Sequence, residues 1–550
     1  MIAGQLPVRG NLDVLTVKAT LVANHDRGCP ARIWIDARPA ARPDIADWWP
    51  RREPWPFLLG AITDAITAID NGTTPDEAIM AAAATTHRKT GQPLHPGARN
   101  YLRQAVANYL DVAAGRAQAA AGGLRQTDPR EIDLQNRALT CWALHYDNPD
   151  RTVREIRRLR LNIARGQFDG DVAWASVAAK LAVDGVRQNH VVRDPDPQRV
   201  VVVEVGLGDG SEHVIFDGDA TAARAFYDTT ARPRIAALTT DTRTVAGRDC
   251  GGCGFLAACP AVPVARGLLG LPEQHPMTRS VSASDLDSYA RCPAQYATTR
   301  VFYLPRDQVV STAQQRGLAV HRWLAAAHKR DDAGCHTIDF EADHDPLGVL
   351  SDHEWRIARR YLRQHVEYCP LGYDGLAAFE VEPTHYVFDP DADVVVAANP
   401  DLTFIGGYGP VWRETKSTDR DLPADQTAVL HTYTAAALDL VMLAALTEAT
   451  TGSSCGTVEL EVLAPEDSEL YVLEADNPVL LAEARRVIAA AAYRWNTDVT
   501  YAATPAREAE CDWCPVQRWC DGPQSAAAEA PAPARDLDAE LPADLDDPPF

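Results

Sequence analysis

The chain has 550 residues, a net charge of −23 and 46% hydrophobic residues. A single hydrophobic core does not grow to this length, so at least two domains are expected. The negative charge excludes a protein that coats nucleic acid through its overall charge, although local basic patches remain possible.

The N-terminus lacks the charged and then apolar pattern of a signal peptide. The longest apolar helix, around Thr434–Leu446, is interrupted by Asp439 and is too short to span a bilayer. We therefore expect a cytoplasmic protein with no membrane contact.

In chain order, the first distinctive pattern is a set of four cysteines that occurs twice. The first set is Cys29, Cys250, Cys253 and Cys259, and the second set is Cys292, Cys511, Cys514 and Cys520. In each set a Cys-Pro pair comes first, and a C-x2-C-x5-C triplet begins 221 or 219 residues later. Clustered cysteines in a reducing compartment indicate metal more often than disulfides. The pattern predicts a duplicated chain in which each copy is closed by four thiolates.

The other four cysteines, Cys141, Cys335, Cys369 and Cys455, are interpreted as structural. The repeat places the first unit at 1–265 and the second unit at 277–523. Residues 524–550 are rich in Ala, Pro and Asp, and this composition predicts a disordered acidic tail.

The second unit is predicted to be mixed α/β, with a sheet packed against helices. Helices are expected at Ser284–Thr299, with Ser284 as N-cap, and at Leu318–Ala327, Asp352–Tyr368 and Gln426–Leu446. Strands are expected at Leu376–Phe388, Val394–Phe404, Val411–Thr415, Thr457–Val462 and Leu470–Leu473.

Two of these predicted strands carry a chemically meaningful set of side chains. Asp401 lies in one strand, and Glu414 and Lys416 lie at the end of the next. Two acids on neighbouring strands can hold a hard cation such as Mg²⁺. A lysine two residues from Glu414 projects to the same side and can steer an attacking water. Lysine is rare here, with five against 48 arginines, so its presence at this position has extra weight.

These residues resemble the PD-(D/E)XK nucleases of the RecB-like branch. The resemblance is closer to the branch with a four-cysteine cluster, found in AddB-type helicase-nucleases and CRISPR-adaptation nucleases. The matching stretches cover nearly all of the second unit: 282–293, Gly317-x3-His321, Asp401, Glu414-x-Lys416, Gln426 to Tyr433, and the triplet Cys511, Cys514 and Cys520. The family usually spaces the glutamine and tyrosine by four residues, so Gln426 is a poorer match than Tyr433.

The resemblance implies a restriction-endonuclease-like fold and a deoxyribonuclease, expected to be an exonuclease. It implies that Mg²⁺ or Mn²⁺ is bound by His321, Asp401 and Glu414, with Lys416 catalytic and with Gln426 and Tyr433 completing the catalytic set. It also implies a [4Fe–4S] cluster on Cys292, Cys511, Cys514 and Cys520, and the repeat predicts a second on Cys29, Cys250, Cys253 and Cys259. Zinc is the alternative for either set, because four thiolates suit both.

The first unit is predicted to be a degenerate copy that does not cleave. Aligning the two triplets places Glu155 with Glu414, Gln167 with Gln426, Trp174 with Tyr433, Asp64 with His321, Arg157 with Lys416 and Trp142 with Asp401. Without the aspartate a metal is poorly held, and an arginine cannot exchange a proton near neutral pH. Nearby, Arg154, Arg157, Arg158 and Arg160 are candidates for DNA phosphate contacts, with a solvated charged face as the alternative.

The sequence thus predicts two tandem PD-(D/E)XK units, one that cleaves DNA and one that holds DNA or serves as a scaffold. The alternatives are a non-catalytic DNA-binding or assembly subunit and a zinc-stabilised adaptor. A helicase or ATPase partner, and a role in DNA repair or antiviral defence, follow from the family alone. The tip Asp544–Phe550 resembles the acidic tip of bacterial single-stranded-DNA-binding proteins and predicts a partner, with a solubilising tail as the alternative.

Overall fold

The computed structural model describes residues 7–44, 55–119, 123–166, 168–271, 279–307, 311–330, 334–337, 344–371 and 376–522. The chain forms two compact units. Unit 1 comprises 1–261, 294–307 and 516–550, and unit 2 comprises 262–293 and 308–515. The predicted tail and its tip at 544–550 lie outside the described residues.

Unit 1 is built on a five-stranded sheet with the order β11-β10-β8-β7-β4. Its strands are β4 (Arg125–Thr127), β7 (Leu144–Asp147), β8 (Val153–Arg160), β10 (Arg199–Gly206) and β11 (Glu212–Gly218). The central pair, β8 and β10, is parallel, and the remaining pairs are antiparallel. Seven of the eight residues of β10 are buried, as a run of β-branched valines covered on both faces requires.

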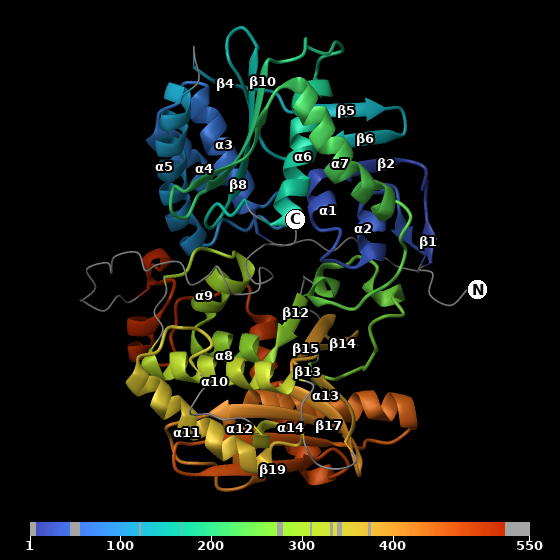
Figure 1. The fold of residues 1–550 in the computed structure, drawn as a ribbon, viewed down its shortest axis with the longest axis vertical. Coiled ribbons are helices and arrows are strands. Elements are labelled where there is room, and N and C mark those ends of the chain that lie inside the picture. Colours follow the sequence, from blue (N-terminus) through green and yellow to red (C-terminus); the bar gives the residue numbers. More distant parts are fainter. Residues whose placement is uncertain are drawn as a thin grey trace. The chain divides into compact units, whose positions relative to one another are not determined.

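Helices cover both faces of this sheet (Figure 1). On one side lie α3 (Leu58–Asp70), α4 (Pro75–Ala83) and α5 (Pro96–Ala119), and on the other lie α6 (Asp169–Asp184) and α7 (Ala220–Leu238). The core between sheet and helices includes Trp174, Val177, Val200 and Val202. The remaining strands and short helices are β1 (Val8–Arg9), β2 (Leu15–Lys18), α1 (Ala19–Ala23), α2 (Pro30–Asp36), β3 (Arg42–Pro43), β5 (Arg130–Leu134), β6 (Arg137–Thr140) and β9 (Val186–Arg187).

Unit 2 is built on a second five-stranded sheet, with the order β13-β16-β17-β18-β19. Its strands are β13 (Ala377–Val381), β16 (Leu402–Gly406), β17 (Gly409–Ser417), β18 (Thr457–Leu463) and β19 (Ser468–Glu474). Here too the central pair, β17 and β18, is parallel and the other pairs are antiparallel. The other elements are β12 (Arg279–Ser282), α8 (Ala283–Arg291), α10 (Thr312–His328), α11 (Asp352–Tyr368), β14 (His385–Asp389), β15 (Val394–Ala398), α12 (Gln426–Thr432), α13 (Thr434–Thr451) and α14 (Pro478–Thr497).

The two sheets have the same strand order and the same pattern of directions when one is read in reverse. A helix connects the parallel pair in each unit: α6 in unit 1, and α12 with α13 in unit 2. The smaller sheets also correspond, because β2 pairs with β6 as β12 pairs with β15, in parallel, and β5 and β14 add antiparallel strands. The prediction of a mixed α/β fold is confirmed.

Several predicted elements are divided in the structure. The expected strand Leu376–Phe388 forms two strands, β13 and β14, and the expected strand Val394–Phe404 forms β15 and β16. Pro383 and Pro400 lie at the interruptions, because proline has no N–H to donate to a neighbouring strand. The first helix starts one residue earlier than expected, since Ser282 is the N-cap in a capping box with Asp285, and it ends at Arg291. The helix Gln426–Leu446 is broken at Tyr433, whose backbone is extended.

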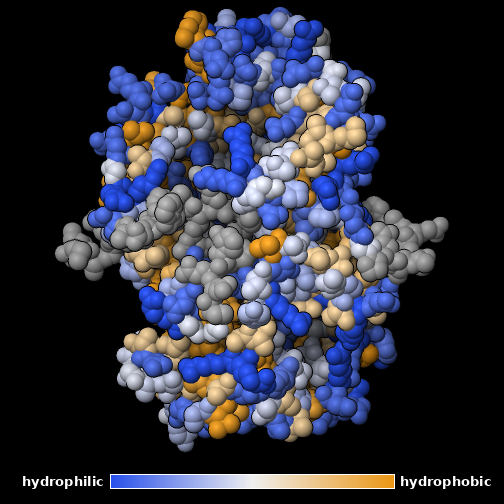
Figure 2. Space-filling view, turned by 180° about the vertical axis from the view of Figure 1, so that it is seen from behind, coloured by the Kyte–Doolittle hydropathy of each residue, from blue (hydrophilic) through white to orange (hydrophobic). Residues whose placement is uncertain are grey.

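One described helix, Thr434–Thr451, is long and apolar enough to cross a membrane, but 56% of it is buried inside the protein. This helix, α13, packs on β17 and β18 and is a core helix of unit 2. The face of the molecule in Figure 2 is mostly hydrophilic, with its hydrophobic residues scattered in small groups.

A buried ion-pair network in unit 1 should contribute strongly to stability. Arg130 is 2% exposed and donates to Asp147 at 2.6 Å and to Asp194 at 2.8 Å. Replacing Arg130 by Met leaves two buried carboxylates without this partner, which should cost about 3–5 kcal/mol of unfolding free energy. Arg232, which is exposed and paired with Asp228 four residues away, is the control, and its replacement should cost under about 0.5 kcal/mol. Urea unfolding followed by tryptophan fluorescence measures both, and equal effects would contradict the prediction.

Candidate active site

The candidate site of unit 2 is centred on β17, where Glu414 and Lys416 project from one face. The Lys416 ammonium donates to the Glu414 carboxylate at 2.5 Å. Glu414 is buried, at 4% exposure, whereas about a third of the Lys416 side chain is exposed. Residues two apart on a strand share a face, so the strand itself brings the Glu414 carboxylate and the Lys416 ammonium together.

Asp401 and His321 join this pair from two other elements. Asp401 precedes β16, and the antiparallel register that pairs Leu402 with Arg413 places it beside Glu414. One Asp401 oxygen accepts the backbone N–H of Thr415 at 2.7 Å, and the other lies 3.4 Å from Nδ1 of His321 on α10. The structure therefore brings His321, Asp401, Glu414 and Lys416 together.

Gly317 explains how α10 comes this close to β17. A Cβ at position 317 would lie 3.0 Å from Oγ of Ser417, tighter than side chains normally pack. A glycine removes that obstacle, and His321 one helical turn later then reaches Asp401. A glycine at position 317 therefore leaves room for the Ser417 hydroxyl where α10 approaches β17.

The four groups shift one another's proton affinities. Burial raises the pKa of Glu414, and Asp401 adds to this effect, while the Lys416 ammonium opposes it. Burial opposes ionisation of Asp401, but the nearby His321 outweighs this effect and lowers the pKa of Asp401. Burial also opposes ionisation of Lys416, but the Glu414 and Asp401 carboxylates outweigh it and raise the pKa of Lys416. A buried acid with a raised pKa gains from a bound cation, which supplies the missing positive charge.

Sequence reasoning missed one acid of this site, Asp439 on α13. Asp439 is 2% exposed, and its Oδ2 has no hydrogen-bond partner among the described residues. Burial, and then the charge of Glu414, raises the pKa of Asp439 well above its ordinary value. The sequence does contain a signal, because burying a lone acid in an Ala/Leu helix costs free energy unless the acid has a role. From the sequence alone, we interpret Asp439 only as an interruption of an apolar stretch.

Gln426 and Tyr433 occupy different positions from those predicted. We expected them seven residues apart on one helix face, but α12 ends before Tyr433. Gln426 donates to the backbone carbonyl of Val472 at 2.6 Å. Tyr433 is half-buried; burial raises its pKa, and the nearby Lys416 charge opposes the shift. Of the two, Tyr433 is the one that the structure places near Lys416.

The donor set of this site suits a hard divalent ion. Two carboxylates and an imidazole are available from Asp401, Glu414 and His321, and Asp439 adds a buried oxygen without a hydrogen-bond partner among the described residues. Mg²⁺ and Mn²⁺ prefer such ligands. Lys416 beside Glu414 can position a water next to the ion.

In unit 1, the glutamate that we compare with Glu414 is Glu155, and it is surrounded by arginines. Glu155 on β8 accepts two bonds from Arg116 at 2.8 Å each and one from Arg157 at 2.7 Å. Burial opposes its ionisation, but Arg116 and Arg157 lower its pKa overall. The β7–β8 register pairs Glu155 with Tyr146, so Tyr146, and not Trp142, lies where Asp401 lies in unit 2.

Counting residues points to Trp142 because the residue opposite the glutamate lies 13 positions before Glu414 but only nine before Glu155. Trp142 lies outside the strands, is 47% exposed and packs on Phe57 with ring centroids 5.6 Å apart. Asp70, and not Asp64, is the residue of α3 that reaches the site, where it accepts a bond from the Tyr146 hydroxyl at 2.6 Å. Gln167 lies outside the described residues.

The arginines predicted to contact DNA are mostly buried and have partners within unit 1. Arg154 donates to the carbonyl of Ala182 at 2.6 Å and also to that of Pro195. Arg158 and Arg160 both pair with Asp171, and Arg160 also pairs with Glu204 at 2.5 Å. Arg154, Arg157 and Arg160 are at most 9% exposed. This placement argues against phosphate contacts by Arg154, Arg157, Arg158 and Arg160, because the guanidinium groups are already satisfied inside the fold.

The two cysteine triplets have the same local structure. The first cysteine lies in a short 3₁₀ helix, Arg248–Gly252 or Glu508–Trp513, and a second 3₁₀ turn, Leu256–Ala258 or Gln517–Trp519, precedes the last. In the first set, backbone N–H groups of Val245 and Gly247 donate to the sulfurs of Cys29 and Cys250 at 3.4 and 3.3 Å. In the second, Gly522 donates to Cys520 at 3.3 Å. N–H donors aimed at sulfur stabilise thiolates, as a metal or cluster site requires.

Comparisons with known proteins identify part of the chain. Residues 280–521 match the family model of the PD-(D/E)XK nuclease superfamily. No curated protein matches the chain. Among solved structures, the chain is similar to one titled "Crystal structure of SSO0001", with 12% identity, a TM-score of 0.23, and coverage of 44% of this chain and 86% of that chain. The prediction of a PD-(D/E)XK superfamily domain in the second half is confirmed.

Asp439 offers a test of the electrostatics of the site. Burial, and then the charge of Glu414, raises the pKa of Asp439 and so favours its neutral, protonated form. Asn resembles the protonated acid in shape and charge, so we expect Asp439→Asn to leave the thermal midpoint of the cation-free protein within about 2 °C. Asp439→Leu, which removes the polar atoms, is the comparison. A large loss of stability in Asp439→Asn would show that the native group is ionised.

Proposed function

We propose that the PD-(D/E)XK domain at 280–521 is a metal-dependent deoxyribonuclease that acts on DNA ends or single strands. The observation that carries the proposal is the arrangement of Asp401, directly before β16, beside Glu414 and Lys416 on β17, inside the matched region. His321 from α10 completes a donor set suited to Mg²⁺ or Mn²⁺. An exonuclease mode remains part of this proposal.

In the proposed reaction, His321, Asp401 and Glu414 hold the cation. When bound, the cation supplies Lewis-acid chemistry and stabilises charge on the phosphate. Lys416 keeps its proton, because the two carboxylates raise its pKa, and so donates hydrogen bonds to the attacking water or to a phosphate oxygen. Tyr433 contributes a phenol beside Lys416, and we retain Gln426 as a weaker candidate that would have to leave its bond to Val472.

We further propose that unit 1 is a degenerate copy of the same fold that does not cleave. The matching strand order and directions of the two five-stranded sheets support a duplication. Glu155 has both carboxylate oxygens bonded to arginine, and Tyr146 opposes it in place of an aspartate. Unit 1 would then serve as a scaffold or hold DNA through groups other than the four arginines described above.

Each cysteine set is proposed to hold a [4Fe–4S] cluster, on Cys29, Cys250, Cys253 and Cys259 and on Cys292, Cys511, Cys514 and Cys520. The shared 3₁₀ turns and the N–H donors to sulfur support a thiolate role for both. Proposed partners are DNA, a helicase or ATPase, and a protein that binds the tip at 544–550. A non-catalytic DNA-binding or assembly subunit is the outcome if the site does not cleave.

Substitutions in the candidate site test the catalytic proposal. Asp401→Ala, Glu414→Ala and Lys416→Ala should each lower the cleavage rate at least about 100-fold, because each removes charge stabilisation from the transition state. Lys329, an exposed lysine paired with Glu382, is the control, and Lys329→Ala should cleave at the parent rate. The assay uses labelled single- and double-stranded DNA with Mg²⁺ and Mn²⁺. A Lys416→Ala protein as fast as its parent would remove this site from consideration.

Metal analysis tests the two proposed clusters. Anaerobically purified protein should contain about eight iron and eight sulfide per chain, four of each per cluster. Cys29→Ser and Cys292→Ser should each lose about half of the iron, while Cys141→Ser, which changes a buried cysteine outside both sets, should lose none. Iron-free protein that carries zinc in both sets would refute the cluster assignment.

A further inference from the structure

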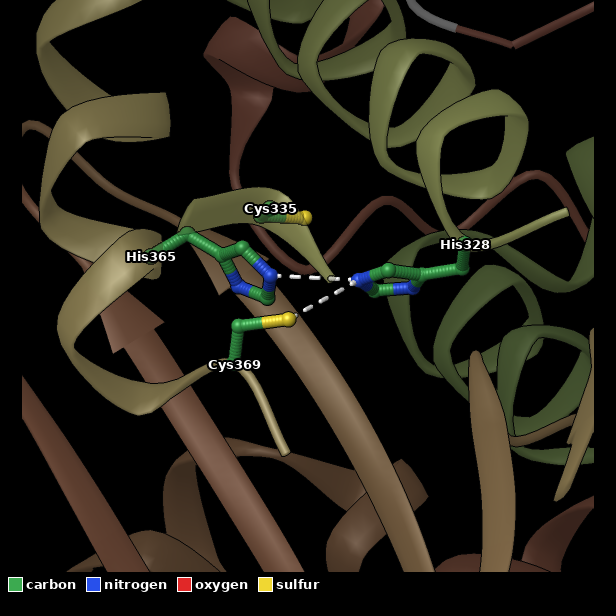
Figure 3. A group of neighbouring side chains, drawn as sticks. All are labelled: His328, Cys335, His365 and Cys369. Atoms are coloured by element: carbon green, nitrogen blue, oxygen red, sulfur yellow. Dashed lines mark hydrogen bonds between the residues drawn. The ribbon is translucent and has the colours of Figure 1, made fainter. Parts of the chain in front are cut away.

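A second group of metal-type ligands lies in the core of unit 2, separate from the candidate active site. His328, Cys335, His365 and Cys369 are all buried, and one ligand atom from each lies within 4.8 Å of the others (Figure 3). Cys335, His365 and Cys369 are fully buried, and His328 is 4% exposed. Our interpretation of Cys335 and Cys369 as structural cysteines did not anticipate this group.

The ligands come from the ends of three elements. His328 is the last residue of α10, Cys335 begins a 3₁₀ turn at Cys335–Thr337, and His365 and Cys369 lie at the end of α11. Four residues separate His365 from Cys369, so both face the same side of the helix end. The C-terminal ends of α10 and α11 carry partial negative charge, which favours a cation at this point.

Two separations between ligand atoms, both measured from His328, agree with a tetrahedral site. Nε2 of His328 lies 3.2 Å from Nε2 of His365 and 3.8 Å from Sγ of Cys369 (Figure 3). Zinc bonds of about 2.05 Å to nitrogen and 2.3 Å to sulfur in tetrahedral geometry imply about 3.3 Å between nitrogens and about 3.6 Å between nitrogen and sulfur. The observed values lie within a few tenths of an ångström of these expectations.

Glu461 on β18 supplies the support that metal-bound histidines usually have. Both of its carboxylate oxygens lie 2.9 Å from Nδ1 of His365, so this nitrogen donates and Nε2 is directed at the group.

We propose that His328, Cys335, His365 and Cys369 form a structural zinc site in unit 2. Two thiolates and two imidazoles in a closed, buried, tetrahedral set are the ligands of a structural zinc and leave no position open for substrate. The site joins α10 and α11 to β18 through Glu461. Glu461 also accepts a bond from Thr415 Oγ1 at 3.2 Å, and Thr415 lies between Glu414 and Lys416 on β17.

Elemental analysis of the full-length protein tests the site independently of nuclease activity. Protein purified anaerobically and passed over a chelating resin should retain about one zinc per chain. His328→Ala and Cys369→Ser should each retain less than about 0.1 zinc per chain, with their iron content unchanged. His328→Cys should retain about one zinc per chain, because a third thiolate replaces the imidazole. Cys455→Ser and His353→Ala, which change an unrelated cysteine and an exposed histidine of α11, should keep their zinc.

A measurement on the unaltered protein covers the case in which the variants do not fold. A mercurial thiol reagent should release about one zinc per chain into a zinc-binding dye, and cobalt in its place should give the absorption of tetrahedral thiolate-bound cobalt. Three results would overturn the proposal. They are native protein that keeps its iron but contains no zinc, zinc content unchanged in both His328→Ala and Cys369→Ser, and a Cys335–Cys369 disulfide found by mass spectrometry. Asp401→Ala and Lys416→Ala should keep the zinc, so this site and the nuclease site can fail separately.

Discussion

The position of β17, between β16 and its parallel partner β18, is the constraint that links the two candidate sites of unit 2. Alternation along β17 directs Glu414 and Lys416 to one face and Thr415 to the other. The register then sets Thr415 opposite Glu461, whose carboxylate bonds both Thr415 and His365. A slip of one residue would reverse every side chain and dismantle both groups together.

Much of the fold was predictable because local signals specify it. The helix Asp352–Tyr368 has the predicted bounds, as its strong two-sided pattern and the N-cap Ser351 would suggest. Glu414 and Lys416 were predictable for the same reason, since strand alternation alone places them together. The mistakes fell where a single residue changes the backbone, as at Pro383 and Pro400. They also fell where the two hairpins place the glutamate at different distances from the turn, as with Trp142 and Tyr146.

The remaining parts of the sites depend on long-range packing that no local pattern encodes. Asp439 reaches the candidate active site only because α13 packs on β17. The proposed histidine and cysteine ligands lie on elements whose helix ends meet only in the folded chain. For the arginines of β8, the local pattern pointed to a surface role that the packing of unit 1 does not support. A run of charge usually lies at the surface, yet here it is neutralised by Glu155, Asp171 and Glu204 within unit 1.

Gly317 has a consequence for the choice of ion. A Cβ at position 317 would lie 3.0 Å from Oγ of Ser417, so either that hydroxyl or α10, which carries His321, would have to give way by a few tenths of an ångström. That displacement is as large as the difference between magnesium–oxygen and calcium–oxygen bond lengths, about 2.1 against about 2.4 Å. In the proposed nuclease, the position of His321, and with it the fit of a cation, would thus depend in part on a residue that has no side chain and contacts no ion.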